Sequence, residues 1–216
     1  MTTNRKGLGR TLRSEAKPAS SYHHGNLEQA LVHLATELIA KHGVESLTLR
    51  LLGERLGVSR TALYRHFSDK QTLLVRVAEE GFAQFGDALE AARASTSPID
   101  VFVRMAHAYF SFAQKHPGQY RVMFDASVLK KAHTAKLHAA AKRSFASLFD
   151  EVVGDSAKLQ GNSPESIGAR VLGLWSLLHG YSMLAINGQF DDNRAAVTKA
   201  MVASVEALVK GQRAES

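Results

Sequence analysis

Apolar residues recur three and four positions apart along most of the chain, which is the spacing of one face of an α-helix. The first such segment lies between Asn26, a candidate N-cap, and Gly43, a candidate C-cap. No stretch reads as a pair of strands, and neither a hairpin signal nor an internal repeat is present in the sequence. The pattern therefore predicts an all-α fold.

Polar capping residues predict where the later helices begin. Three serines precede long apolar-periodic segments, and two acids are expected in the first turn of the last helix. These positions are Ser68 with Gln71 at the capping-box spacing, Ser97 before Pro98, Ser163 before Pro164, and Asp191 with Asp192. One further helix is expected within residues 129–153.

Residues 48–67 predict two short helices joined by a tight turn. Thr48 and Ser59 are placed to cap the two helices, and Gly57 between them permits a left-handed backbone. The inward-facing apolar residues are Leu49, Leu52 and Leu56 in the first helix, and Leu63 and Phe67 in the second. The opposite arc of the second helix carries Arg60, Thr61, Tyr64 and Arg65. This arrangement is typical of a helix–turn–helix motif, whose second helix enters the major groove of DNA.

The charge of the chain favours a polyanionic partner. Lys and Arg outnumber Asp and Glu by 27 to 20, which gives a net charge of +7 and a pI near 9.7. Residues 48–70 alone carry five Lys or Arg against two acids. Arginine pairs with guanine edges, and threonine and tyrosine reach phosphates or a thymine methyl. We interpret the motif as a DNA-binding element; the alternative on pattern alone is a helical hairpin with a solvated basic face.

Other classes of function find little support in the sequence. The chain has no cysteine, which excludes disulfides, thiolate nucleophiles and cysteine-bound metals. It has no nucleophile elbow, phosphate-binding loop or zinc-protease helix, and its ten histidines form no ligand set. We therefore expect no enzyme, no metal and no cofactor. Residues 171–190 carry no formal charge but too many polar groups for a lipid-facing span, so a soluble, cytoplasmic protein with no membrane partner is expected.

Residues 26–74 resemble the N-terminal DNA-binding domain of the TetR (AcrR-like) family of bacterial transcription regulators. The resemblance rests on four motifs at that family's spacing, namely Thr48-Leu-Arg50, Gly57-Val-Ser59, Leu63-Tyr-Arg-His-Phe67 and Asp69-Lys70. The opening Tyr22-His-His-Gly-Asn-Leu27 and the later Trp175-Ser-Leu-Leu-His179-Gly180 resemble the subgroup with a WHG-type C-terminal domain. Leu51 and Gly53 depart from the family pattern, but neither belongs to the DNA-facing set.

The resemblance implies contacts with double-stranded operator DNA at the matching positions. Phosphate or groove-edge contacts are implied for Thr48 and Arg50, base contacts for Arg60, Thr61 and Ala62, and phosphate contacts for Tyr64, His66 and Lys70. Arg65 joins this set through its place on the polar arc of the second helix.

For the second half of the chain, the resemblance implies a helical bundle that binds a small-molecule effector and forms a homodimer through its last two helices. The candidate pocket residues are aromatic, sulfur-containing or polar side chains. They are Phe102, Met105, Tyr109, Phe112, Tyr120, Met123, Phe124, Trp175, His179 and Met183. The alternative for each is ordinary core packing, and His179 is expected either to contact a ligand or to be a core histidine with a protein partner.

The expected organisation has three parts: a flexible basic arm over residues 1–21, the helix–turn–helix DNA-binding domain over 22–70, and the helical ligand-binding and dimerisation domain over 71–216. The arm is interpreted either as a minor-groove contact or as an untethered tail. The implied function is a ligand-responsive regulator that binds a near-palindromic operator. Repression is favoured over activation because no extra domain for recruiting polymerase is apparent.

Overall fold

The computed structural model describes residues 27–131, 134–156, 163–190 and 193–214, and within them the chain folds into ten α-helices and one short 3-10 helix without any strand. The predicted all-α fold is confirmed for these residues. The candidate cap Asn26 and the basic arm lie outside the described residues. Among the described helices, none is both long enough and apolar enough to cross a membrane.

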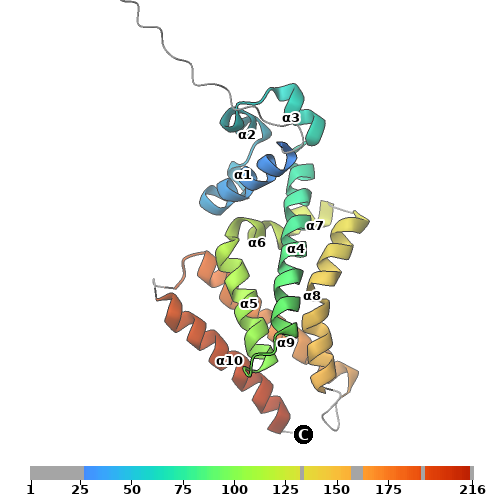
Figure 1. Ribbon diagram of the computed structural model, residues 1–216, viewed down its shortest axis with the longest axis vertical. Helices are drawn as coiled ribbons and strands as arrows, with labels where there is room; N and C mark the ends of the chain where they lie inside the picture. The colour runs from blue at the N-terminus through green and yellow to red at the C-terminus, as the bar shows by residue number, and fades with distance from the viewer. Residues whose placement is uncertain (1–26, 132–133, 157–162, 191–192, 215–216) are drawn as a thin grey trace, which may run out of the picture.

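A small three-helix unit lies at one end of the molecule (Figure 1). It consists of α1 (Leu27–His42), the 3-10 helix η1 (Val44–Ser46), α2 (Leu49–Leu56) and α3 (Arg60–His66). Gly43 follows the last residue of α1 with φ 79° and ψ 166°, a positive-φ conformation that glycine adopts without strain. The predicted C-cap is therefore confirmed.

The long helix α4 (Lys70–Ala94) connects this unit with the rest of the molecule (Figure 1). Its 25 residues extend about 37 Å. The predicted cap at Ser68 is wrong by one residue, because the carboxylate of Asp69 accepts the Thr72 amide at 2.7 Å. A carboxylate interacts more favourably with a helix N-terminus than a hydroxyl does, and Ser68 instead contacts the Thr72 hydroxyl.

The remaining helices form a bundle around the lower part of α4 (Figure 1). They are α5 (Val101–Lys115), α6 (Pro117–Met123), α7 (Ala126–Lys131), α8 (Ala135–Ser156), α9 (Pro164–Ile186) and α10 (Arg194–Ala214). Helix α8 packs along α4, while α9 and α10 pack on α5. One apolar cluster runs through the molecule from Leu27 in α1 to Val209 in α10. The division of the chain at residues 21 and 70 stays a prediction.

Helix starts in the bundle differ from the sequence prediction in three places. Helix α5 begins after Asp100, whose carboxylate accepts the Phe102 amide at 2.8 Å, and not at Ser97. The single helix expected within 129–153 is two helices, α7 and α8. Helix α10 begins after Asn193, whose side chain accepts the Ala196 amide at 3.1 Å, so the acids at 191–192 are not in its first turn; they lie outside the described residues. The start at Ser163 is confirmed.

Candidate nucleic-acid interface and regulatory bundle

Local capping forms the turn between α2 and α3 as the sequence predicts. The Thr48 hydroxyl accepts the Leu51 amide at 3.1 Å, and the Ser59 hydroxyl accepts the Ala62 amide at 3.2 Å. Gly57 between the two helices has φ 66° and ψ 29°, in the left-handed region. Each cap satisfies an amide that would otherwise have no partner, so the short helices begin at defined residues.

Close packing fixes α3 against α2. Leu49, Leu52, Leu63 and Phe67 are buried, and Leu56 is half-buried. Gly53 lies at the contact, where an added Cβ would come within 3.2 Å of Leu63 Cδ1. The departure of Gly53 from the family pattern therefore falls at a direct contact between the two helices.

The polar arc of α3 faces outward. Arg60, Thr61, Tyr64, Arg65 and His66 are exposed, with Tyr64 at 50% of its full accessibility, and Ala62 is half-buried. Helix α3 contains no acidic residue. Its exposed side chains thus combine positive charge with hydrogen-bond donors, which suits the phosphates and base edges of DNA.

The remaining predicted DNA contacts flank this arc. Thr48 and Arg50 are exposed at the start of α2, and Lys70 is half-buried at the start of α4. The Arg50 guanidinium lies 3.3 Å from the Glu54 carboxylate, and both side chains are more than half exposed. An exposed pair of this kind contributes little to stability, so Arg50 remains available to phosphate. The contacts assigned to these nine residues stay predictions.

In the bundle, five of the ten candidate pocket residues lie together. Rings of Tyr109, Tyr120, Phe124, Trp175 and His179 form successive contacts, with centroid separations from 4.5 to 6.1 Å. Phe82 and Phe85 of α4 and Phe145 of α8 complete this aromatic cluster, and the sequence did not single them out. Only their helical spacing as core residues was visible in the sequence.

The other candidates lie around this cluster or away from it. Met105 and Met123 are fully buried, and Met183 is half-buried. Phe112 borders the cluster, with ring centroids 5.2 Å from Phe85 and 4.8 Å from His116. Phe102 lies near the start of α5, where it lines a small space shared with α8, α9 and α10. The ten predicted residues therefore do not line one common space.

A chain of polar groups crosses the aromatic cluster. Tyr120 OH donates to Tyr109 OH at 3.1 Å, and the same oxygen lies 2.8 Å from His179 Nδ1. Burial raises the pKa of both tyrosines and lowers the pKa of His179, so all three groups are uncharged near neutral pH. One ring nitrogen of His179 therefore has a hydrogen-bond partner within the protein. This is the core-histidine alternative of the two that the sequence left open.

Two further polar atoms in this region lack a hydrogen bond. Trp175 Nε1 and Ser182 Oγ are buried without a hydrogen bond of good geometry, although the indole lies near enough to Tyr109, and the hydroxyl near enough to Tyr120, to oppose the rise in pKa of those tyrosines. Ser182 is one turn beyond His179 on α9, and the sequence did not single it out. A buried polar atom without a hydrogen-bond partner lowers the stability of the protein when no ligand is bound. A bound molecule with an uncharged polar group can supply the missing hydrogen bond.

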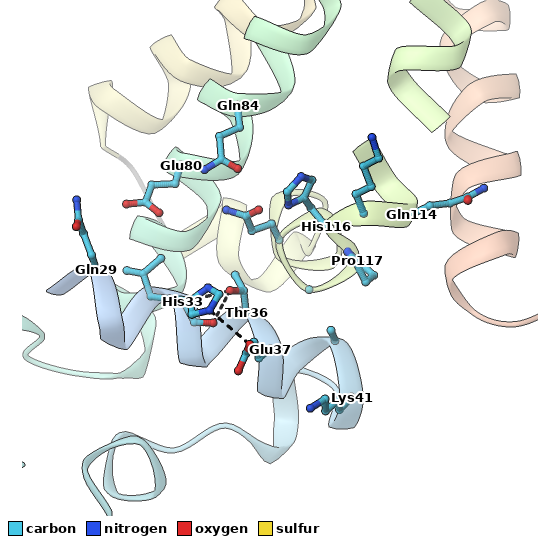
Figure 2. Close-up of a pocket in the computed structure, with 15 residues that line it drawn as sticks. Gln29, His33, Thr36, Glu37, Lys41, Glu80, Gln84, Gln114, His116 and Pro117 are labelled. Atoms are coloured by element: carbon cyan, nitrogen blue, oxygen red, sulfur yellow. Dashed lines mark hydrogen bonds and ion pairs between the residues drawn. The ribbon is translucent and has the colours of Figure 1, made fainter. Parts of the chain in front are cut away.

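A polar cleft lies beside the contact between α1 and the start of α6. It has a volume of about 640 Å³ and is lined by residues of α1, α4 and the junction of α5 with α6. Figure 2 shows His33 and Glu37 on its α1 side, Glu80 and Gln84 on α4, and His116 beside Pro117. The described residues contain no group of three acidic or histidine side chains that would hold a metal ion.

These observations define a DNA-binding regulator, in which a small basic helix–turn–helix unit is attached to a larger helical bundle. Residues 31–77 match the family described as bacterial regulatory proteins of the tetR family, and residues 102–208 match the tetracyclin repressor-like C-terminal domain. The chain belongs to the TetR family of bacterial transcriptional regulators, which confirms the family that the sequence motifs indicated.

Individual relatives agree with this assignment. The uncharacterized HTH-type transcriptional regulator Rv0681 of Mycobacterium tuberculosis is 30% identical over 191 residues, which span 87% of this chain and 81% of that protein. The tetracycline repressor protein class C of Escherichia coli is 49% identical over 51 residues, or 24% of this chain and 23% of that repressor. A solved structure of a protein with unknown function from Rhodococcus sp. RHA1 has a TM-score of 0.70 at 29% identity, covering 88% of this chain and 97% of that one. The chain is a transcriptional regulator and not an enzyme.

Proposed function

We propose that this regulator is a repressor that binds a near-palindromic operator as a homodimer and leaves it when a small molecule binds the bundle. The observation that carries the proposal is the outward arc of α3, which is exposed, free of acids, and held in place by its buried inner face. Two such helices, about 34–36 Å or a multiple of this distance apart, would read two half-sites on one face of DNA.

The outer face of α9 supports the homodimer. Ala169, Gly173, Ser176, Gly180 and Leu184 recur at helical spacing on this face, and Leu172 beside them is 56% exposed. An added Cβ would meet nothing within 4 Å at Gly173 or Gly180. An uncharged face of small and apolar residues allows a second helix to approach closely. Exposed alanines at 196, 200, 203 and 207 continue such a surface on α10.

The polar groups within the aromatic cluster support an uncharged effector. A molecule between α5, α6 and α9 would meet aromatic walls together with the unpaired donor Trp175 Nε1 and the hydroxyl of Ser182. No ionised side chain belongs to this set, so a neutral compound with an oxygen acceptor fits it better than an anion does. Such a ligand would release DNA if it binds better to a conformation with misplaced α3 helices.

The DNA-binding part is tested with the double variant Arg60→Ala, Tyr64→Ala. The operator is first recovered from a pool of random duplexes with the native protein, and its affinity is then measured by band shift. Loss of the bidentate base contact proposed for Arg60, together with the phosphate contact proposed for Tyr64, should weaken specific binding by about 10–100-fold. The matched control is Arg143→Ala on α8, an exposed arginine far along the chain, which removes the same charge. Equal operator affinity for the double variant and the control would contradict the assignment.

A further inference from the structure

Helix α6 is the part of the bundle that contacts the DNA-binding unit most closely. Its second residue, Gly118, lies so close to the backbone of α1 that an added Cβ would overlap the Thr36 carbonyl and come within 3.1 Å of the Ala40 amide nitrogen. Figure 2 shows Thr36 of α1 facing the segment around Pro117. A displacement of α6 would therefore displace α1 as well, because no side chain lies between the two backbones to take up the change by altering its rotamer.

Arg121, one turn further along α6, connects two helix C-termini. Its Nη1 donates to the Ala40 carbonyl at 2.9 Å, and its Nη2 donates to the Ile186 carbonyl at 2.6 Å. The same Nη2 lies 3.5 Å from Asn187 Oδ1. Ala40 is in the last turn of α1 and Ile186 is the last residue of α9. Carbonyls in a last helical turn lack intrahelical partners and carry the negative end of the helix dipole, so one guanidinium satisfies both ends.

The other end of α1 is held separately. Arg76 of α4 donates from Nε to Glu28, in the first turn of α1, at 2.8 Å. Glu28 and Ala40 are separated by 12 residues, or about 18 Å along the helix. A helix attached at one end can rotate about that attachment, whereas attachment at both ends fixes its direction. The contact made by Arg121 is therefore at the position where it limits this rotation most.

We propose that Arg121 is a positioning residue for DNA binding, which fixes the orientation of the helix–turn–helix unit relative to α9. The preceding residue, Tyr120, bonds to Tyr109 of α5 and His179 of α9, so neighbouring side chains of α6 contact both the polar cluster and α1. A change at the end of α9 thereby reaches α1 through one guanidinium. The proposal concerns orientation within one chain and goes beyond the proposed operator and effector.

An arginine is required by this geometry. The guanidinium presents five donors in a rigid plane, which lets it bond to carbonyls that lie in different directions. Lysine retains the charge but has a single nitrogen on a flexible stem. Arg121→Lys should therefore hold one of the two helix ends well and the other poorly, and Arg121→Met should hold neither.

The test measures the orientation directly. The chain has no cysteine, so the exposed residues Glu45 in η1 and Lys142 in α8 can be replaced by cysteine and spin-labelled without background. Labelled protein diluted into excess unlabelled chain reports one intrachain distance by pulsed electron paramagnetic resonance. We expect a single narrow distribution for the native residue, a broader or displaced one for Arg121→Met, and an intermediate one for Arg121→Lys.

Arg104→Met is the matched control. Arg104 also donates to several backbone carbonyls, those of Ala92 at 2.9 Å, Ser97 at 3.1 Å, Arg93 at 3.2 Å, and Ile99. All of these lie in the last turn of α4 or in the connection between α4 and α5, so its loss should lower stability without changing the label distance. A distribution for Arg121→Met that superimposes on the native one, or an equal broadening in both variants, would overturn the proposal. If Arg121→Met does not fold, the comparison of Arg121→Lys with Arg104→Lys decides in the same way.

DNA binding provides a second readout. Arg121→Met should bind the operator about tenfold more weakly and bind random DNA with unchanged affinity, because α3 keeps its charges and loses only its fixed direction. Equal weakening on both DNAs would contradict a positioning role. Failure of the native protein to select any operator would instead contradict the proposed function and leave the distance measurement as the test of Arg121.

Discussion

The contact between Gly118 and α1 gives a sharp prediction for Gly118→Ala. In most helices this change is favourable, because alanine has a helix propensity up to about 1 kcal/mol better than glycine. At Gly118 the added Cβ would overlap the Thr36 carbonyl oxygen, approach the carbonyl carbon to 2.9 Å and approach the Ala40 nitrogen to 3.1 Å. All three are backbone atoms, which cannot move aside by changing rotamer. Relief of the overlap therefore requires α6 to move away from α1.

The expected cost follows from that displacement. Ordinary contacts between nonbonded heavy atoms lie at about 3.5–4.0 Å, so relief of the overlap with the Thr36 carbonyl oxygen requires the helices to separate by roughly 1.5 Å. Overpacking of this kind typically costs about 1–3 kcal/mol. Since the gain in helix propensity is smaller, we expect Gly118→Ala to lower the free energy of unfolding by about 1–2 kcal/mol.

Urea unfolding followed by circular dichroism measures this change. The control is Gly168→Ala in α9, where an added Cβ meets nothing within 4 Å, so the variant should be as stable as the native protein or about 0.5–1 kcal/mol more stable. The two glycine substitutions should thus shift the midpoint in opposite directions. A Gly118→Ala protein at least as stable as the Gly168→Ala protein would refute the reasoning.

Two further predictions concern buried polar groups. Asp155 of α8 and Arg170 of α9 form a 3.0 Å ion pair with side chains only 11% and 7% exposed. Because Asp155→Ala would leave the Arg170 charge buried without this partner, the variant should lower the free energy of unfolding, measured with urea, by about 3–5 kcal/mol. A decrease of less than about 1 kcal/mol would contradict a buried ion pair. Burial lowers the pKa of His179, so the unfolded chain takes up protons first as the pH falls. Stability should therefore be full above about pH 6.5 and decrease below it, a trend that His179→Gln should reduce; urea midpoints that do not fall between about pH 7.5 and 5.5 would contradict this.

The parts of the fold with local signals could be predicted from the sequence. The caps at Thr48 and Ser59 and the turn at Gly57 depend on bonds between residues that are at most five positions apart. The start predicted at Ser97 was wrong because Asp100, three residues later, offers a carboxylate that caps α5 in its place. Asp69, and not the predicted Ser68, caps α4 for the same reason. Where two capping residues are close together, the sequence pattern alone does not decide between them.

The connection between the two halves could not be predicted in this way. Arg121 bonds to carbonyls 81 and 65 positions away in the sequence, and neither Ala40 nor Ile186 carries a side-chain signal for such a bond. The close approach at Gly118 likewise depends on the packing of α6 against α1. Candidate pocket residues were chosen by type, and only those on facing sides of α5, α6 and α9 came together. Phe102, at the other end of α5, did not.

The most direct test is a crystal structure of the protein bound to its selected operator duplex. The account predicts that the exposed arc of α3 lies in the major groove, with the Arg60 guanidinium within hydrogen-bond distance of a base edge and Tyr64 against a phosphate. A complex in which DNA contacts another surface while Arg60 and Tyr64 face solvent would contradict it.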